Sequence, residues 1–131
     1  MSERTFFANA RLLDPASGLD ETGGLLVEGR MIVDFGAHLD TAPEDADVID
    51  CDGFCLSPGL IDMRVHLGEP GAEHKETLTT LSQAAAKGGV TAVVGLPNTD
   101  PPIDDAAVVE FLARRGREVR GVKVFAYGAA T

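Results

Sequence analysis

The sequence predicts an α/β protein built in two parts, a small unit of short β-strands followed by strands that alternate with helices. Two observations carry this prediction. Residues 4–56 show no sustained helical period and are broken repeatedly by turn-forming residues, which is typical of short strands. After this stretch, apolar runs alternate with segments whose apolar residues recur every three to four positions, as they do on one face of a helix.

The first part is predicted to be a small β unit. A strand is expected to begin at 5–7, and a turn is expected at 14–18, where Asp, Pro, Ser and Gly gather. Residues 24–33 are typical of a hairpin, because two apolar runs flank a short turn that contains glycine. The acidic segment 37–46 is expected to be a loop, and 47–50 another short strand.

The second part is predicted to begin with a strand at 60–67. A helix is expected at 75–87, since its leucines and alanines fall on one face and two glycines follow it. The β-branched run at 90–96 indicates a buried strand. Asp104 can cap a second helix with an apolar stripe, and a third strand is expected at 122–127.

This order of elements indicates two loops as candidate positions for functional residues. Strands separated by helices of about 10–15 residues pair in parallel with right-handed crossovers. In such folds, functional residues gather beyond the carboxyl ends of the strands. The loops at 66–73 and 97–103 occupy that position.

The charge balance narrows the range of partners. The chain has 131 residues, with 21 acidic against 11 basic side chains and a formal net charge of −10. Binding to nucleic acid or to an anionic membrane needs clustered Lys and Arg, so neither is an expected partner. No apolar run reaches the roughly 18 residues of a membrane span. Cys51 and Cys55 are too few for a disulfide framework or a zinc site of their own, and a cytoplasmic protein with reduced thiols is expected.

The segment 64–66 is the first candidate for metal chemistry. Alternate residues of a strand face the same side, so Arg64 and His66 are expected to point together. Two histidines at these positions would form half of a metal site, but a guanidinium has no lone pair to donate and repels a cation. Taken alone, His66 is more often a hydrogen-bonded core or loop histidine than a metal ligand.

A longer motif surrounds this segment. Residues 57–71 are Ser-Pro-Gly-Leu-Ile-Asp-Met-Arg-Val-His-Leu-Gly-Glu-Pro-Gly. They resemble the metal-site signature of dihydroorotases, Pro-Gly-Leu-Ile-Asp-x-His-x-His-x-Arg-x-Pro-Gly. The resemblance spans nearly the whole chain, and its other segments are 9–15, 76–78, 84–91, 96–104 and 128–131.

The resemblance implies both a fold and an activity. Residues 1–56 would contribute to a small β-sandwich, and 57–131 would form the first βαβαβ part of a (β/α)8 TIM-like barrel, incomplete in this chain. The family consists of amidohydrolases that interconvert carbamoyl-aspartate and dihydroorotate in pyrimidine biosynthesis. Zinc lowers the pKa of a bound water and polarises the ring carbonyl, while a carboxylate handles the proton. The related hydantoinase and allantoinase activities stay open.

Site residues carry over position by position. His66 matches the second metal histidine, and Asn98 matches the substrate-binding asparagine. Asp62 matches the aspartate before the metal pair and is expected to support the strand end. Arg64 stands where the first metal histidine belongs, and Gly68 stands where the substrate-clamping arginine belongs. The chain holds no counterpart of the remaining metal histidines or the catalytic aspartate.

These departures support a second interpretation. Arg64 is expected to cost most of the zinc affinity, and Gly68 removes a charge-assisted contact to a carboxylate. Some dihydroorotase-like proteins with degenerate metal motifs are non-catalytic partners of aspartate transcarbamoylase, and this motif is similar to theirs. Since a complete barrel takes about 250 residues, we expect the chain to be the N-terminal part of a longer protein and inactive alone.

Overall fold

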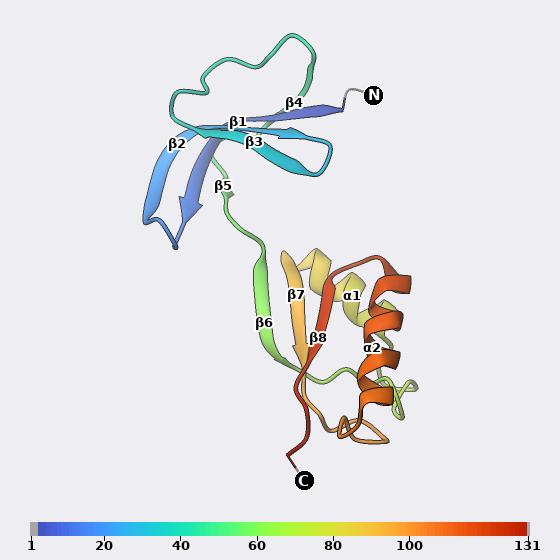
Figure 1. Ribbon diagram of the computed structural model, residues 1–131. Helices are drawn as coiled ribbons and strands as arrows, with labels where there is room; N and C mark the ends of the chain where they lie inside the picture. Colours follow the sequence, from blue (N-terminus) through green and yellow to red (C-terminus); the bar gives the residue numbers. More distant parts are fainter. Residues whose placement is uncertain (1–2, 131) are drawn as a thin grey trace. The chain divides into compact units, whose positions relative to one another are not determined.

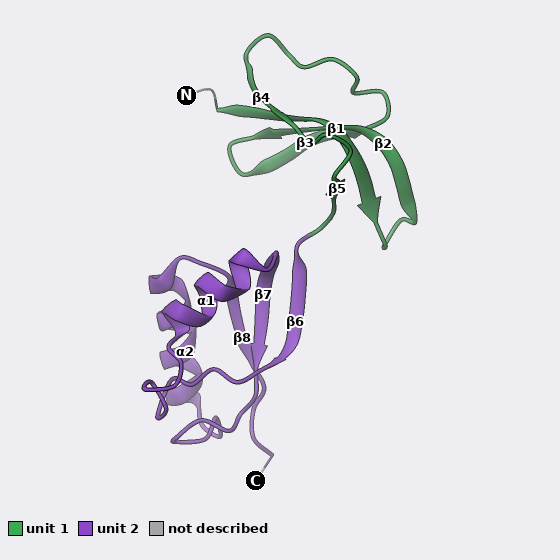
Figure 2. Ribbon diagram, turned by 180° about the vertical axis from the view of Figure 1, so that it is seen from behind, with its two compact units in different colours: residues 1–58 green, residues 59–131 purple. Residues whose placement is uncertain are grey.

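The structure is a computed structural model that describes residues 3–130. Residues 1, 2 and 131, which fall within the predicted domain ranges, lie outside the described residues. The chain divides into two compact units, residues 1–58 and 59–131 (Figure 2). The mixed α/β class predicted from the sequence is confirmed, while the domain boundary predicted after residue 56 stays a prediction.

The first unit is a five-stranded sheet with the strands β1 (Arg4–Asp14), β2 (Leu19–Glu28), β3 (Met31–Gly36), β4 (Ala46–Asp50) and β5 (Cys55–Leu56). The strand order is β3-β2-β1-β4, and β5 also pairs with β1 (Figure 1). The β1–β2 and β2–β3 pairs are antiparallel, whereas β4 and β5 run parallel to β1. The predicted hairpin is the β2–β3 pair.

Strand β1 begins one residue before the start predicted at Thr5 and extends to Asp14. Its buried residues Phe6, Ala10 and Leu12 fall on alternate positions of the strand, although the register against β2 shifts between Phe7 and Ala10. Asn9 lies in this shift with a φ of 55° and donates a hydrogen bond from Nδ2 to Oδ1 of Asp50 at 3.0 Å. The bulge places one extra residue of β1 against β2.

The second unit contains β6 (Leu60–Val65), α1 (Leu78–Lys87), β7 (Val90–Gly95), α2 (Ala106–Val119) and β8 (Lys123–Ala126). The three strands form a parallel sheet in the order β6-β7-β8. Both helices pack together on one face of this sheet (Figures 1 and 2). The predicted alternation of strands and helices is confirmed, and none of the helices within residues 3–130 is long and apolar enough to cross a membrane.

Both helices begin where a side chain caps them. Thr77 accepts a hydrogen bond from the backbone N–H of Thr80 and forms a capping box, so α1 begins after Thr77 and the predicted start at 75 is wrong. Asp105, not the predicted Asp104, caps α2 by accepting from the N–H of Val108 at 3.0 Å. The caps hold the helices over a core cluster made of Leu67, Leu78, Ile103, Val108 and Leu112.

Candidate functional site

The side chains of His66 and Asn98 meet beyond the carboxyl ends of two neighbouring parallel strands. His66 directly follows β6, and Asn98 lies in the loop after β7. Nδ2 of Asn98 is 3.0 Å from Nδ1 of His66. Because an amide nitrogen can only donate, Nδ1 accepts, and the neutral imidazole carries its proton on Nε2. Two residues that the sequence indicated separately therefore lie at one site.

A cavity of about 400 Å³ opens at this pair. Its volume lies in the range of small-molecule sites, roughly 300–1,000 Å³. The loop after β6 contributes His66, Gly68 and Lys75 to its wall, and the loop after β7 contributes Asn98 and Asp100. The cavity therefore combines an imidazole, an amide and charged groups of both signs.

The two loops that line the site are joined by a backbone hydrogen bond. The backbone N–H of Asp100 donates to the carbonyl oxygen of Pro70 at 3.1 Å. Gly71 has a φ of 100°, and a Cβ built on it would lie 2.5 Å from Cβ of Asp100. The close approach of the loops thus depends on the absence of a side chain at Gly71.

The backbone of the loop requires a glycine at residue 68, where the family motif has an arginine. The φ of Gly68 is +72°, and a Cβ at this position would lie 2.4 Å from the carbonyl oxygen of Glu76. Both the left-handed backbone and the contact exclude an ordinary side chain. The loop is therefore built for glycine at 68, and an arginine there would require the backbone to move.

The backbone around Arg64 departs from regular strand geometry. The register of β6 against β7 shifts between Asp62 and Val65, and Oδ1 of Asp62 accepts from the backbone N–H of Arg64 at 3.0 Å. The shift, and the end of β6 at Val65, interrupt the alternation that would point residues 64 and 66 the same way. Arg64 is exposed and, within residues 3–130, is not part of the cavity wall, whereas His66 is. Asp62 contacts the backbone at the strand end, where the sequence predicts its supporting role.

A buried carboxylate that the sequence does not single out lies next to the site. Glu69 is 5% exposed. Its Oε1 accepts from Nε of Arg115 at 2.6 Å, and its Oε2 accepts from the N–H of Leu78 at 3.0 Å. Burial raises the pKa of Glu69, but the hydrogen bonds from Arg115 and Leu78 outweigh burial and hold the pKa below its ordinary value of 4.5. The signal in the sequence was a charged residue between Gly68 and Pro70, inside the motif segment.

The zinc implied by the family resemblance does not fit the side chains present. Among residues 3–130, no group of three or more His, Cys, Asp or Glu side chains could hold a metal ion. A zinc site takes at least three protein ligands. At this edge of the sheet His66 offers one imidazole, and its Nδ1 already accepts a hydrogen bond. The chemistry available to these residues is therefore that of hydrogen-bond donors and charges.

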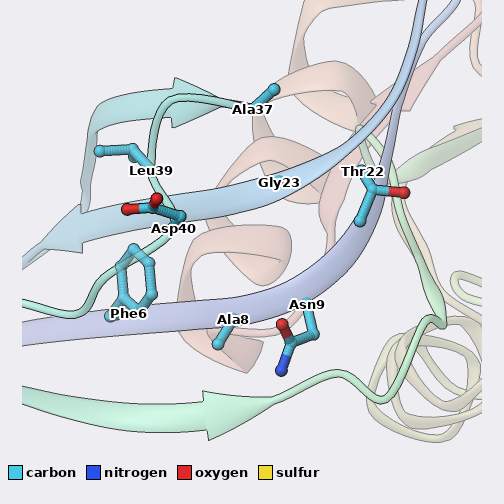
Figure 3. A pocket seen from close by; sticks show the side chains of 8 residues that line it. All are labelled: Phe6, Ala8, Asn9, Thr22, Gly23, Ala37, Leu39 and Asp40. Carbon is cyan, nitrogen blue, oxygen red and sulfur yellow. The ribbon is translucent and has the colours of Figure 1, made fainter.

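Two further cavities lie in the first unit. One, of about 150 Å³, is lined by Phe6, Asn9 and Asp40 among others (Figure 3). Another, of about 390 Å³, is lined mostly by aliphatic and aromatic side chains, including Leu25 and Phe35. Neither combines a cation, an imidazole and an amide, so the edge formed by β6 and β7 is the candidate site.

The sequence matches one family model and many curated proteins. Residues 53–131 match the family described as Dihydro-orotase-like. The "Dihydroorotase" of Anaplasma phagocytophilum (strain HZ) is 47% identical over 129 residues, which is 95% of this chain and 29% of that protein. The "Dihydroorotase" of Wolbachia sp. subsp. Drosophila simulans (strain wRi) is 49% identical over 125 residues, or 95% of this chain and 28% of that protein. The chain thus spans under a third of the length of these relatives.

Solved structures share the fold of the chain. The L-hydantoinase (dihydropyrimidinase) from Arthrobacter aurescens has a TM-score of 0.82 and 25% identity, covering 98% of this chain and 28% of that one. The dihydropyrimidinase from Brevibacillus agri NCHU1002 has a TM-score of 0.77 and 25% identity, covering 95% of this chain and 26% of that one. The arrangement of strands and helices therefore matches the corresponding segment of these hydrolases.

Proposed function

The chain belongs to the Dihydro-orotase-like family, and from this premise we propose that it binds substrate in a hydrolase of cyclic amides. The substrates we propose are carbamoyl-aspartate and dihydroorotate, which such an enzyme interconverts in pyrimidine biosynthesis. The curated relatives named dihydroorotase support this reaction over hydantoinase activity. The cytoplasmic location expected from the free thiols of Cys51 and Cys55 stays a prediction.

The observation that carries the proposal is the contact between His66 and Asn98 at the wall of the cavity. One N–H of the Asn98 amide is bound to Nδ1 of His66, which leaves the second N–H and Oδ1 for a ligand. The imidazole presents its Nε2–H. Two donors and an acceptor at one place suit the carboxylate and ring amide of dihydroorotate.

His66 and Asn98 can bind and orient the substrate, but they do not supply all the groups that the reaction needs. Ring hydrolysis also needs an activated water and stabilisation of the developing charge on the carbonyl oxygen. In this family zinc supplies both, and its ligands do not come together among residues 3–130. We therefore assign Asn98 to substrate binding and His66 to orienting the amide of Asn98.

A ligand-binding and turnover experiment on the intact protein tests the proposal. Asn98→Ala is expected to lower kcat/KM for dihydroorotate about tenfold or more, since it removes a contact to a charged group. The matched control is Gln83→Ala, an exposed residue of α1 that lies away from the cavity. Equal activity of both variants would contradict the assignment of Asn98.

A second candidate function follows from Arg64 and Gly68. Both stand at positions where the family motif places a metal ligand and a substrate clamp. Among residues 3–130, no three or more His, Cys, Asp or Glu side chains come together in a group that could hold a metal ion. The protein would then be a non-catalytic partner of aspartate transcarbamoylase. Stoichiometric zinc together with turnover of dihydroorotate in the intact protein would exclude this candidate. Loss of the transcarbamoylase activity on removal of this protein would support it.

A further inference from the structure

Lys75 is a basic residue in the wall of the cavity that holds His66 and Asn98. It lies in the loop between β6 and α1, two residues before the N-cap Thr77, and forms part of the cavity wall. Its side chain is exposed and makes no ion pair with any residue in the described part of the chain. The ammonium group is therefore available to a ligand.

Gly68 makes room for this arrangement. A Cβ at residue 68 would lie 2.4 Å from the carbonyl oxygen of Glu76 and 2.8 Å from its Cβ. The backbone next to Lys75 thus occupies the space that a side chain at 68 would need. The position that lacks a side chain thus lies against Glu76, the residue directly after the one that carries the cation.

Two carboxylates limit where an anion can bind. Glu76 and Asp100 also line the cavity. Glu76 accepts a hydrogen bond from the hydroxyl of Thr80, whereas the carboxylate of Asp100 has no hydrogen-bond partner within residues 3–130. Since Asp100 repels an anion, a bound carboxylate is expected on the side of Lys75, and its affinity is expected to fall with added salt.

We propose that Lys75 is a specificity-determining residue that selects ring amides bearing a carboxylate over uncharged ones. Its ammonium attracts the carboxylate into the cavity, and Asn98 donates a hydrogen bond to the ligand there. Lysine acts as a compact point charge, so it replaces the charge of a clamping arginine without its two parallel hydrogen bonds. This inference rests on the proposed function, because it concerns the same cavity.

Calorimetric titration of the intact protein tests the role of Lys75. The probes are carbamoyl-aspartate, dihydroorotate and dihydrouracil, the last being the ring without its carboxylate. Lys75→Gln is expected to weaken binding of both acids about fivefold and to leave the binding of dihydrouracil unchanged. Lys75→Arg is expected to restore binding of the acids. Asp100→Asn is expected to strengthen binding of the acids about twofold. The matched control is Lys87→Gln, at the far end of α1 and outside the cavity.

The outcomes separate this inference from the proposed function. An equal loss for acids and dihydrouracil in Lys75→Gln, or no loss at all, overturns the role of Lys75. Turnover of dihydroorotate that is unaffected by Lys75→Gln overturns it as well and leaves the proposed function standing. Binding of the acids that Lys75→Gln weakens, without any turnover by the intact protein, supports the role of Lys75 and contradicts the proposed reaction.

Discussion

The carboxylate of Glu69 and the guanidinium of Arg115 connect the site loop to helix α2. Oε1 and Nε are 2.6 Å apart, and the two side chains are 7% and 30% exposed. The other carboxylate oxygen accepts from the N–H of Leu78, the first residue of α1. One buried side chain, next to Gly68, thereby fixes the loop that carries His66 to both helices.

Removal of this carboxylate is expected to destabilise the protein. Glu69→Ala leaves the N–H of Leu78 without its buried acceptor and is expected to lower the free energy of unfolding by about 2 kcal/mol. Chemical denaturation measures the change, and Glu110→Ala, an exposed residue of α2, is the control. Equal midpoints for the two variants would show that Glu69 does not hold the loop.

The contribution of Glu69 is expected to disappear in acid. Its pKa in the folded state lies below the ordinary value of 4.5, because the hydrogen bonds from Arg115 and Leu78 outweigh the effect of burial. A carboxyl with a lowered folded pKa stabilises the protein above its unfolded pKa, and this stabilisation is lost as the pH falls through the folded pKa. The difference in stability between wild type and Glu69→Gln should therefore be constant near neutral pH and shrink below about pH 4.5. A difference that is independent of pH would contradict the charged hydrogen bonds.

Gly68→Ala is expected to destabilise the site loop more than the same change at a glycine with open space. Gly68 and Gly89 have similar φ values, +72° and +77°, but a Cβ on Gly89 would meet nothing within 4 Å. Gly89→Ala is therefore expected to cost about 1 kcal/mol from the left-handed backbone alone. Gly68→Ala adds the clash with Glu76 and is expected to cost about 2–4 kcal/mol. Equal losses in thermal unfolding would mean that the loop relaxes freely around residue 68.

Restoring the arginine of the family motif at residue 68 would introduce the same clash with Glu76. Combining Arg64→His with Gly68→Arg is expected to destabilise the intact protein, not simply to raise its zinc affinity. Thermal unfolding alongside zinc titration measures both effects. A double variant as stable as Gly89→Ala that binds zinc would show that the backbone at residue 68 adapts to a side chain.

The imidazole of His66 is expected to be the Nε2–H tautomer when neutral, because the amide nitrogen of Asn98 donates to Nδ1. Nitrogen NMR at high pH distinguishes the two tautomers. Asn98→Ala should allow a mixture, since it removes the donor. A wild-type ring protonated on Nδ1 would mean that Asn98 presents Oδ1 to the ring and its two N–H groups to the cavity.

The order of strands and helices was predictable because each carries a local apolar period. The parallel strand order followed from the alternation, and it placed the loops of His66 and Asn98 at one edge. The exact ends of the elements were harder to predict. Asp104 and Asp105 are adjacent and equally able to cap a helix, so only the backbone of α2 distinguishes them.

The supporting contacts of the site could not be predicted from local patterns. Glu69 and Arg115 are 46 residues apart in sequence, and neither segment indicates its partner. The sequence marks Gly68 as a missing arginine, but its positive φ and its approach to Glu76 depend on how the whole loop folds. Lys75 lies outside the motif segment 57–71, and only the path of the loop brings it to the cavity.

The hydrogen bond from Asp100 to Pro70 constrains how this site can diversify in evolution. Because Gly71 packs against Asp100 without space for a side chain, an insertion in either loop would displace the other. Changes of loop length, one form of the loop variation by which barrel folds support many chemistries, are thus restricted here. New ligand preferences would arise instead through exchange of single side chains on a fixed frame, at positions such as Lys75.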